Sequence, residues 1–404
     1  MPLQSVLPTV SSVAWTSIVT GCNPGKHNIF GFVDRVPQTY EMYIPGSRHV
    51  LAPTWVDLFS QQGLRVFSMG VPGTYPPKPV NGILISGFLA PSLEKAAYPE
   101  GVAAELSEMG YVIDIDAWQA RENTDRFLDE VFLALERRCE AMLHYLAREK
   151  WDLFVAHIMD TDRLHHFLWG QMETGSEVYE PWFYRFYARV DAALGELADR
   201  LDDDTLLVIL SDHGFCRMKQ EVHVNTWLKQ AGLLSFDTPA PKQLRDIAPS
   251  SRCYSLLPGR IYVRVRGREY EGCVSPGADY ETVRRDVASG LEGLVDTETG
   301  ERVVERVYMR EELFSGDAFE LAPDLVVHPC RGYDLKGGFE KDILMERGPV
   351  SGTHTLDDAM LYVNRPGLSA DDARLVDVLP TVFSVLDQRV PEGVDGRTLA
   401  GIQA

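Results

Sequence analysis

The sequence predicts an α/β fold in which helices cover both faces of a mostly parallel central sheet, with a small α+β subdomain inserted into it. Two apolar segments, 153–159 and 206–210, have the length and the β-branched content of buried strands. A long segment with apolar residues at helical spacing precedes each of them, over 129–150 and 179–201. When helices alternate with strands in this way, right-handed crossovers bring the strands together in parallel.

Composition narrows the range of partners. The chain has 404 residues, of which 45% are hydrophobic, so it has room for a large core or two domains. A net charge of −20 without a basic stripe argues against nucleic acid as a partner. No apolar run of about 18 residues marks a membrane span. The six cysteines form no Cys-x-x-Cys pair and are typical of reduced thiols. We therefore expect a cytoplasmic protein with no nucleic-acid or membrane partner.

Residues 7–21 predict a loop that enters a short helix ending at Gly21. Ser11 would then lie at the amino end of the helix, where unpaired N–H groups and the helix dipole favour an anion. A hydroxyl at this point can be partly ionised and can hold a phosphate beside it. The same position also suits an N-cap, so the residues alone leave both roles open.

The region after position 50 predicts a helix and then a strand, LRVFSMGVP, which ends in a loop over 72–79. Residues 81–122 follow, rich in Gly, Pro and aromatic residues and without a strong period. Because long irregular segments often cover binding sites, we interpret 72–125 as a lid-like insertion over the sheet.

The composition changes again after residue 234. The elements expected there are separated by Pro and Gly turns and are, in order, a strand at 260–266, a helix at 280–294 and a strand at 302–309. Together they predict an inserted α+β subdomain over 235–322. The α/β core would then be discontinuous and comprise 1–234 and 323–404.

Acidic and histidine side chains follow three of the predicted elements. They are Asp162 and His166 after the first strand, Asp212 and His213 after the second, and His354 after a Gly-containing turn. Asp162 and His166 are four residues apart, so they share one face of a helix and can converge on a metal ion. Because the carboxyl ends of parallel strands meet at one edge of a sheet, all five side chains could gather there.

Three neighbouring polar residues are expected to play other roles. His165 is three residues from Asp162 instead of four, and we expect it to pack or to support the site. Asp160 is expected to cap the helix or to lie in solvent. His157 lies within the apolar strand and predicts a core histidine.

Taken in order, the motifs resemble those of the alkaline phosphatase superfamily. They are PTVSSVAWTSIVTGCNPGKH, MDTDRLHHFLW, LSDHGF followed by VNTWLKQAGLL, SGTH, and the closing VDVLPTVFSVLDQRVPEGVDGRTL. The nearest branch is the type I phosphodiesterase/nucleotide pyrophosphatase group, in its prokaryotic phosphohydrolase/phosphomutase-like form. The similarity covers nearly the whole chain and rests on several spaced motifs in the right order.

The resemblance implies a phosphoric ester hydrolase that acts on a small phosphate ester through a covalent phospho-enzyme. Two zinc or manganese ions would flank the nucleophile, which corresponds to Ser11. Carried over residue by residue, the ligands would be Asp162, His166 and His354 for one ion, and Asp212 and His213 for the other. Two ions ~4 Å apart can stabilise the attacking and leaving oxygens, and coordination lowers the pKa of a hydroxyl.

Two departures from the family pattern stand out. Members normally carry a further Asp ligand for the second ion, at the end of a strand tens of residues before the nucleophile. Here ten residues precede Ser11, and none is acidic. We expect that the first core strand is missing, with a substitute such as Asp34 as the alternative. In addition, the Asn that contacts phosphate in nucleotide-hydrolysing members corresponds to Phe32, which argues against nucleotide pyrophosphatase activity.

Other functions fit the same residues. A phosphomutase or phosphomonoesterase would use the same scaffold, and a truncated metal-binding protein with little activity is a third interpretation. A sulfatase is disfavoured because the chain has no Cys-x-Pro-x-Arg motif.

Overall fold

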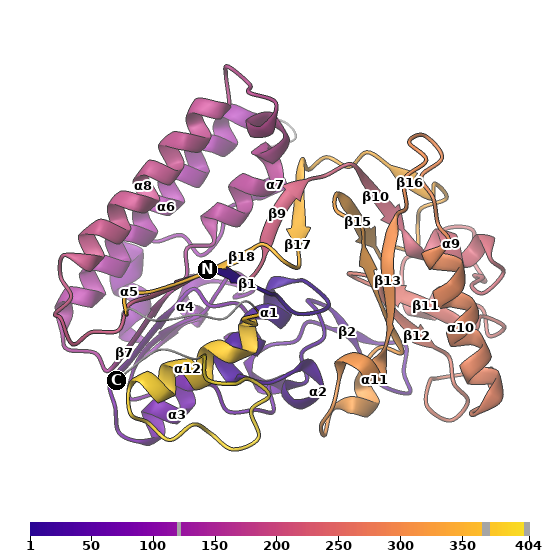
Figure 1. Cartoon of the computed structure of the whole chain (residues 1–404), viewed down its shortest axis with the longest axis horizontal. Helices are drawn as coiled ribbons and strands as arrows, with labels where there is room; N and C mark the ends of the chain where they lie inside the picture. Colours follow the sequence, from indigo (N-terminus) through magenta and orange to yellow (C-terminus); the bar gives the residue numbers. More distant parts are fainter. Residues whose placement is uncertain (119–122, 366–371, 400–404) are drawn as a thin grey trace.

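The computed structural model describes residues 1–118, 123–365 and 372–399. Figure 1 shows two lobes. One lobe is built from strands and helices of both chain ends. The other surrounds the four-stranded sheet formed by β11, β12, β13 and β14. Each lobe has its own set of buried apolar residues, so each has its own hydrophobic core.

The first lobe contains two sheets. One comprises β4 (Val66–Met69), β5 (Gly82–Ile85), β6 (Ala97–Tyr98) and β7 (Leu153–Ala156), in the order β6-β5-β4-β7. Its central pairs, β4 with β5 and β4 with β7, are parallel, and β5 pairs antiparallel with β6. The other sheet is antiparallel and has the order β1-β18-β8, from Pro2–Leu3, Ala359–Val363 and Val208–Leu210.

Helices cover both faces of this lobe. One face carries α5 (Gly101–Glu108), α6 (Thr124–Arg148), α7 (Asp160–Glu173) and α8 (Glu180–Ala198), and the other carries α1 (Ser11–Thr20), α3 (Trp55–Gln61) and α12 (Val378–Val385). Successive side chains of β4 alternate between them, because Phe67 packs in the α6 cluster and Val66 in the α1 cluster. The predicted α/β class with helices on both faces is therefore confirmed.

The region expected to form a lid contributes to the sheet. β5 and β6 lie within 72–125, and β5 pairs with β4 along four residues. The apolar run of β5 is too short to stand out as a strand among its Gly and Pro neighbours. Residues 119–122, also within the predicted insertion, lie outside the described residues.

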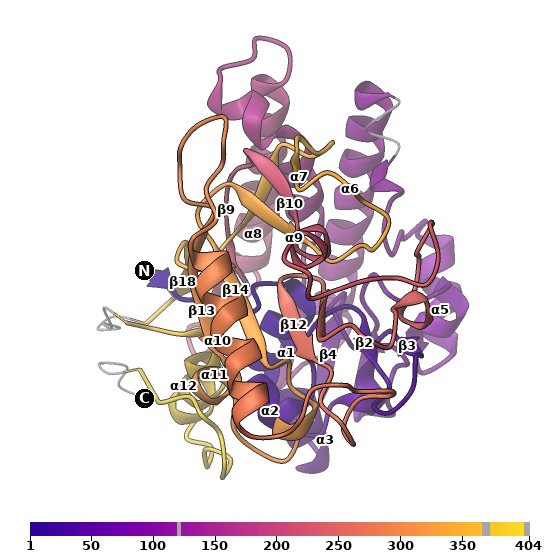
Figure 2. The ribbon, with the colours of Figure 1, turned by 90° about the vertical axis from the view of Figure 1, so that its right-hand side faces the viewer.

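The second lobe is organised around a four-stranded antiparallel sheet, in the order β11-β12-β14-β13. Its strands are Cys253–Leu256, Arg260–Val263, Leu325–Pro329 and Val304–Met309, and Figure 2 shows α10 (Ala278–Glu292) packed against them. A three-stranded sheet, β15-β10-β16, adjoins it and comprises Tyr333–Lys336, Gln220–His223 and Met345–Glu346, next to α9 (Val224–Gln230). β14 pairs with β12 and β13. The predicted boundary at 323 assigns β14 to the α/β core. The division of the chain into domains therefore stays a prediction.

Two strands lie between the lobes in Figure 1: β9 (Gly214–Arg217) and β17 (Gly352–Thr355). They pair antiparallel, with His354 opposite Phe215. The remaining short elements are α2 (Pro24–His27), β2 (Asp34–Arg35), β3 (Met42–Tyr43), α4 (Leu93–Ala96) and α11 (Arg310–Leu313).

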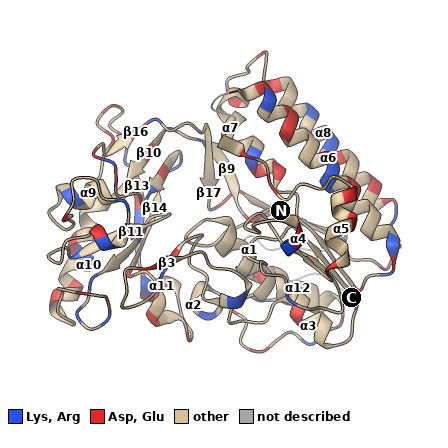
Figure 3. Cartoon of the chain, turned by 180° about the vertical axis from the view of Figure 1, so that it is seen from behind, with Lys and Arg blue, Asp and Glu red and all other residues tan. Residues whose placement is uncertain are grey.

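The surface and the helices agree with the composition. Figure 3 shows acidic and basic residues interspersed along α6 and α8. Among the described helices, none combines the length and the apolar character that a membrane crossing requires. The six cysteines are free thiols.

A buried carboxylate joins three elements of the second lobe. Asp324 is fully buried just before β14 and accepts hydrogen bonds from Arg268 Nη1 (2.8 Å), Tyr280 Oη (2.6 Å) and the Val263 backbone N–H (2.7 Å). Burial alone would raise the pKa of Asp324, but the hydrogen bonds and charge of Arg268 hold the pKa below its usual value.

Replacing Asp324 by Asn should therefore destabilise the protein. Loss of one partner of a buried ion pair typically lowers the free energy of unfolding by about 3–5 kcal/mol. We expect urea denaturation at pH 7 to show a clear loss in Asp324→Asn, and none in Glu392→Gln, which breaks an exposed ion pair.

The same carboxylate has a defined pH dependence. Because its pKa is lowered in the folded state, its contribution is present above about pH 4, the pKa of an unfolded Asp, and disappears as the pH falls through the native pKa. An unchanged denaturation midpoint in Asp324→Asn at pH 7 would contradict this role.

Candidate active site

A buried ion pair holds the first turn of α7. Asp160, the first residue of the helix, accepts a hydrogen bond from Arg138 Nε at 2.7 Å, and both side chains are at most 3% exposed. Arg138 also donates to the Tyr111 hydroxyl and to the Ile113 carbonyl. The sequence predicts that Asp160 caps the helix or lies in solvent. In the structure it instead forms a buried ion pair. It connects α7 to α6 and thereby positions the residues that follow.

The next turn of α7 presents two of the predicted ligands. Asp162 Oδ1 lies 3.5 Å from His166 Nε2, as their spacing of four residues predicts. His354, on β17, places its Nε2 atom 3.3 Å from Asp162 Oδ1 and 3.1 Å from His166 Nε2. One ligand atom from each of the three residues therefore lies within 4.8 Å of the others.

Asp212 and His213 adjoin this group. They follow β8, and His213 Nε2 lies 3.4 Å from Asp212 Oδ2 and 4.0 Å from Asp162 Oδ1. The rings of His213 and His354 stack with centroids 3.7 Å apart. The two carboxylates and three imidazoles thus form one continuous cluster from two strand ends and a helix.

Ser11 completes the cluster. It is the first residue of α1, and its Oγ atom lies 3.2 Å from His213 Nε2. Val10 occupies the N-cap position, and no side chain caps the helix, so the N-cap role considered for Ser11 is not observed. The structure brings all six predicted residues together, while their roles as nucleophile and ligands stay predictions.

Backbone carbonyls orient the three imidazoles in the same way. The Nδ1 atoms of His166, His213 and His354 lie 3.0, 3.2 and 3.2 Å from the carbonyl oxygens of Gly352, Gly214 and Thr9, respectively. If each Nδ1 carries the proton, each Nε2 presents a lone pair to the carboxylates. Metal-ligating histidines commonly have this arrangement, because the second hydrogen bond fixes ring and tautomer.

Protein groups balance the charges in the cluster only in part. Burial would lower the pKa of His354, but the hydrogen bond and charge of Asp162 raise it. Burial lowers the pKa of His166 and His213, so both rings are neutral near pH 7. Burial raises the pKa of Asp212, against a smaller opposing effect of its neighbours. Asp162 Oδ1 and Asp212 Oδ2 are buried without a hydrogen-bond partner in the part of the chain that the structure describes. A divalent cation would satisfy both oxygens, and mixed carboxylate and imidazole donors suit zinc or manganese.

Comparison with known proteins now identifies the family. The family model described as Type I phosphodiesterase / nucleotide pyrophosphatase matches residues 1–357. The chain belongs to this family. The predicted enzyme class, a phosphoric ester hydrolase of the type I phosphodiesterase group, is thereby confirmed.

Solved structures agree on the fold of this phosphodiesterase family member. Phosphonoacetate hydrolase from Sinorhizobium meliloti 1021, in complex with phosphonoacetate, is 17% identical with a TM-score of 0.61, over 93% of this chain and 84% of its own. Human ectonucleotide pyrophosphatase / phosphodiesterase 5 is 12% identical (TM-score 0.55; 98% and 88%). Alkaline phosphatase PafA is 13% identical (TM-score 0.57; 100% and 92%). No curated protein sequence matches significantly.

Several other polar residues of this phosphodiesterase-like chain lie away from the cluster. Asp34 is buried beside Arg260 (3.5 Å) and the Tyr262 hydroxyl (3.2 Å), so the structure does not bring this alternative ligand to the five predicted ones. His165 lies among aromatic rings, with its Nε2 atom 2.5 Å from the Tyr187 hydroxyl, which agrees with the predicted packing role.

A second group of potential ligands occurs in the other lobe. Glu221, His223 and Glu346 also place one ligand atom each within 4.8 Å of one another. However, Lys336 lies 3.5 Å from Glu221 and Lys341 pairs with Glu346, so lysines already balance these carboxylates.

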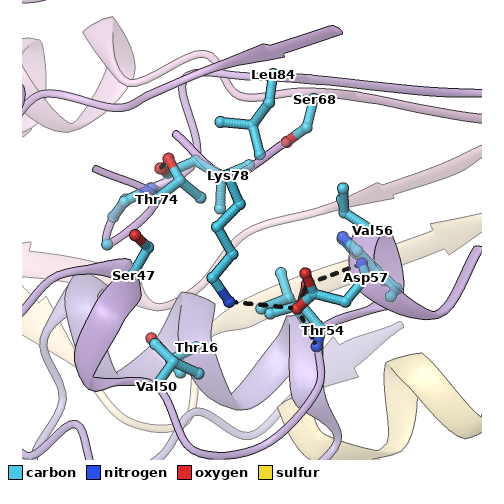
Figure 4. Close-up of a pocket in the computed structure, with 15 residues that line it drawn as sticks. Thr16, Ser47, Val50, Thr54, Val56, Asp57, Ser68, Thr74, Lys78 and Leu84 are labelled. Atoms are coloured by element: carbon cyan, nitrogen blue, oxygen red, sulfur yellow. Dashed lines mark hydrogen bonds and ion pairs between the residues drawn. The ribbon is translucent and has the colours of Figure 1, made fainter. Parts of the chain in front are cut away.

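A cavity beside α1 is separate from the cluster of predicted metal ligands. Figure 4 shows Lys78 extending across it toward Asp57, at 3.5 Å, with Thr16, Ser47 and Ser68 among the lining residues. None of the six predicted site residues lines this cavity. Since its lysine is paired, we assign no chemistry to it.

Sequence analysis did not identify Arg138. The signal was present, because Arg138 falls on the apolar face of its helix, between Leu135 and Met142 at helical spacing. A charged residue at such a position is rarely buried unless paired, which points to an ion pair with a neighbouring element.

Divalent ions should stabilise the folded protein. Because the cluster exists only in the folded chain, an ion at a hundred times its Kd adds about 2.7 kcal/mol per site. We expect zinc or manganese to raise the melting temperature of chelator-treated protein. His354→Ala should reduce this rise. His328→Ala, which changes a half-buried histidine on β14, should leave the rise unchanged.

The rise should also depend on pH. Because burial raises the pKa of Asp212, protons compete with the ion increasingly as the pH falls, so the rise should be smaller at pH 5 than at pH 8. Equal melting shifts for wild type and His354→Ala would contradict a metal site in this cluster.

Proposed function

We propose that this family member is a two-metal phosphodiesterase with Ser11 as nucleophile and a covalent phosphoseryl intermediate. The observation that carries the proposal is the position of Ser11 Oγ, at the amino end of α1 and 3.2 Å from His213 Nε2 within the cluster of ligands. The N–H groups of the first turn of α1 are aimed at the same point, where they favour the negative charge of a phosphoryl group.

The ligands divide into two groups by their contacts. Asp162, His166 and His354 lie close enough to hold one zinc or manganese ion, and Asp212 and His213 would hold a second beside Ser11. The bound ions would lower the pKa of the hydroxyl and stabilise charge on the attacking and leaving oxygens. These assignments agree with the unpartnered carboxylate oxygens of Asp162 and Asp212.

The steps performed by the chain follow from this geometry. The Ser11 hydroxyl releases its proton to solvent and its oxygen attacks phosphorus, while the ester oxygen on the opposite side leaves with the bonding electron pair and takes up a proton from solvent. Water then attacks the phosphoseryl group, which releases the phosphomonoester and restores the serine hydroxyl. Ser11 is positioned for both steps because α1 starts at this residue and is packed against α12.

An aromatic pair beside the cluster supports a diester as the substrate. Phe32 packs against Phe88, with ring centroids 5.4 Å apart. It also packs against a small group of buried apolar residues that includes Val10, the neighbour of Ser11. Arg163 lies over the Phe88 ring at 5.3 Å, and its Nη1 atom is 3.4 Å from Asp162 Oδ2. The two half-buried rings therefore extend between the neighbours of Ser11 and Asp162, where they suit an apolar or aromatic ester substituent.

The charges near the site favour the same substrate class. Arg163 makes a two-pronged ion pair with Asp114, at 3.1 and 2.7 Å, and Lys336 pairs with Asp334 at 2.7 Å. Neither side chain is left to neutralise a second phosphate charge. A singly charged diester requires less compensation than the doubly charged monoester that a phosphomonoesterase or a phosphomutase binds.

Removing the nucleophile tests the proposal. Ser11→Ala should lower hydrolysis of bis(p-nitrophenyl) phosphate by at least about a thousandfold, the scale of a lost nucleophile, while the melting shift on metal addition persists. Ser12→Ala is the matched control, because the Ser12 hydroxyl is buried and has no hydrogen-bond partner among the described residues. Unchanged turnover in Ser11→Ala would remove Ser11 from the mechanism.

Replacing the aromatic ring tests the substrate class. Phe32→Asn should lower kcat/KM for a phenyl diester about fivefold, since one aromatic contact contributes about 1 kcal/mol. Two substrates serve as controls: the corresponding diester with methyl in place of phenyl, and the monoester p-nitrophenyl phosphate. Neither carries the additional ring that would contact Phe32. Equal losses on all three substrates would show that Phe32 only supports the fold.

A further inference from the structure

Phe215 is buried outside the hydrophobic cores of the two lobes. It is the second residue of β9, and it is 8% exposed. Within the part of the chain that the structure describes, it belongs to none of the groups of buried apolar residues that form these cores. A buried phenylalanine usually contributes to such a core. Phe215 instead lies against the histidines of the predicted metal site.

The ring of Phe215 contacts all three predicted imidazole ligands. Its centroid lies 5.0 Å from that of His166, 5.2 Å from that of His354 and 5.5 Å from that of His213. The first two contacts are edge-on, with interplanar angles of 77° and 79°. His166 and His354 belong to the group proposed for the first ion, and His213 belongs to the group proposed for the second. One aromatic ring thus touches ligands of both ions.

The pairing of β9 with β17 places Phe215 at this point. Phe215 lies opposite His354, so the two side chains project from the same face of the strand pair. That face is close to α7, because a Cβ atom at Gly352 on β17 would approach the His165 carbonyl oxygen to 2.5 Å. The position of the Phe215 ring is therefore set by backbone contacts that do not involve the ring itself.

Two further aromatic side chains of α7 contact the same ring. His165 lies edge-on to Phe215 with centroids 4.8 Å apart, and Trp169 is nearly parallel to it at 5.8 Å. His165 is itself fixed, since its ring stacks on Phe183 of α8 at 5.3 Å and its Nε2 atom lies 2.5 Å from the Tyr187 hydroxyl. Rotation of Phe215 away from the cluster would require these rings to move, so packing keeps Phe215 against the three imidazoles.

Hydrogen bonds alone do not fix the three imidazoles. Each Nδ1 atom has one backbone carbonyl as its partner, and a ring held by a single hydrogen bond can still tilt about that bond. An aromatic ring in van der Waals contact restricts the tilt and excludes water from the surface that it covers. The apolar surroundings of a metal site control solvent access, and replacing residues that orient the ligands typically weakens metal binding about 10–100-fold.

We propose that Phe215 is a positioning residue shared by both ions of the proposed site. Its ring fixes the tilt of His166, His213 and His354 and shields these ligands from water. This inference rests on the proposed function, because it presumes the two ions. Since the ring touches ligands of both ions, its removal should weaken the binding of both.

Metal binding tests this role independently of turnover. Chelator-treated protein is dialysed against zinc at fixed free concentrations, and bound metal is measured by elemental analysis. Wild type should bind two equivalents, and Phe215→Leu, which stays apolar but lacks the ring, should bind each about tenfold more weakly. Phe339→Leu is the matched control, because Phe339 is 5% exposed in the core of the second lobe. This control should bind both equivalents with wild-type affinity.

Two more variants and a spectrum separate positioning from a general loss of stability. Phe215→Tyr keeps the ring and should restore both affinities. Phe215→Met keeps most of the volume without the ring, so it should bind metal as weakly as Phe215→Leu, and it replaces that variant if leucine prevents folding. With cobalt in place of zinc, the visible absorption of the bound ions should change in Phe215→Leu and stay the same in Phe339→Leu, since only the former alters the angles of the nitrogen donors.

The outcomes distinguish this inference from the proposed function. Two equivalents of wild-type affinity in Phe215→Leu would overturn the role of Phe215 and leave the two-metal site intact. Equal losses of affinity in folded Phe215→Leu and Phe215→Tyr would also overturn it, because the ring would then be irrelevant. A wild-type protein that binds one equivalent, weakened in Phe215→Leu, would support Phe215 and overturn the two-metal function. A wild-type protein that binds none would overturn both.

Discussion

Two carboxylate oxygens with no partner impose the main constraint on this structure. Asp162 Oδ1 and Asp212 Oδ2 are withdrawn from solvent, and burial favours the neutral form of two of the neighbouring imidazoles, His166 and His213. A buried carboxylate is costly unless a cation or several hydrogen bonds compensate it. Burial would lower the pKa of His354, but the hydrogen bond and charge of Asp162 raise it, so this imidazole can balance part of the charge as a cation. Bound cations or protons would balance the rest. The proposed metal site is therefore supported by the charge balance as well as by the spacing of its ligands.

The rest of the first lobe serves to hold these groups in place. The buried pair of Arg138 and Asp160 joins α6 to the start of α7, so the Asp162 and His166 side chains leave a helix that cannot easily rotate. The pairing of β9 with β17 sets His354 opposite Phe215 and brings it across to α7. Backbone carbonyls then select the tautomer of each ring. Helix position, strand register and tautomer are thus fixed by separate interactions.

Local features of this site were accessible from sequence, and long-range ones were not. The spacing of Asp162 and His166 predicts a shared helix face, and Asp212 follows an apolar strand, so both could be inferred without coordinates. The place of Arg138 on an apolar helix face indicates an ion pair, but no local pattern identifies Asp160, 22 residues away on another helix, as the partner. Similarly, the place of β14 in the second lobe depends on its pairing with β12 and β13, which the predicted boundary at 323 does not reveal. For β5, three apolar residues after a glycine contain too little periodicity to be recognised.

The charge of the proposed site follows from the same set of ligands. With two divalent ions and the two carboxylates of Asp162 and Asp212, the site would keep a net charge of about +2. The cations Arg163 and Lys336 are already paired with carboxylates. The positive charge that an anionic phosphodiester needs would therefore lie on the ions themselves, at the atoms where charge develops during the reaction.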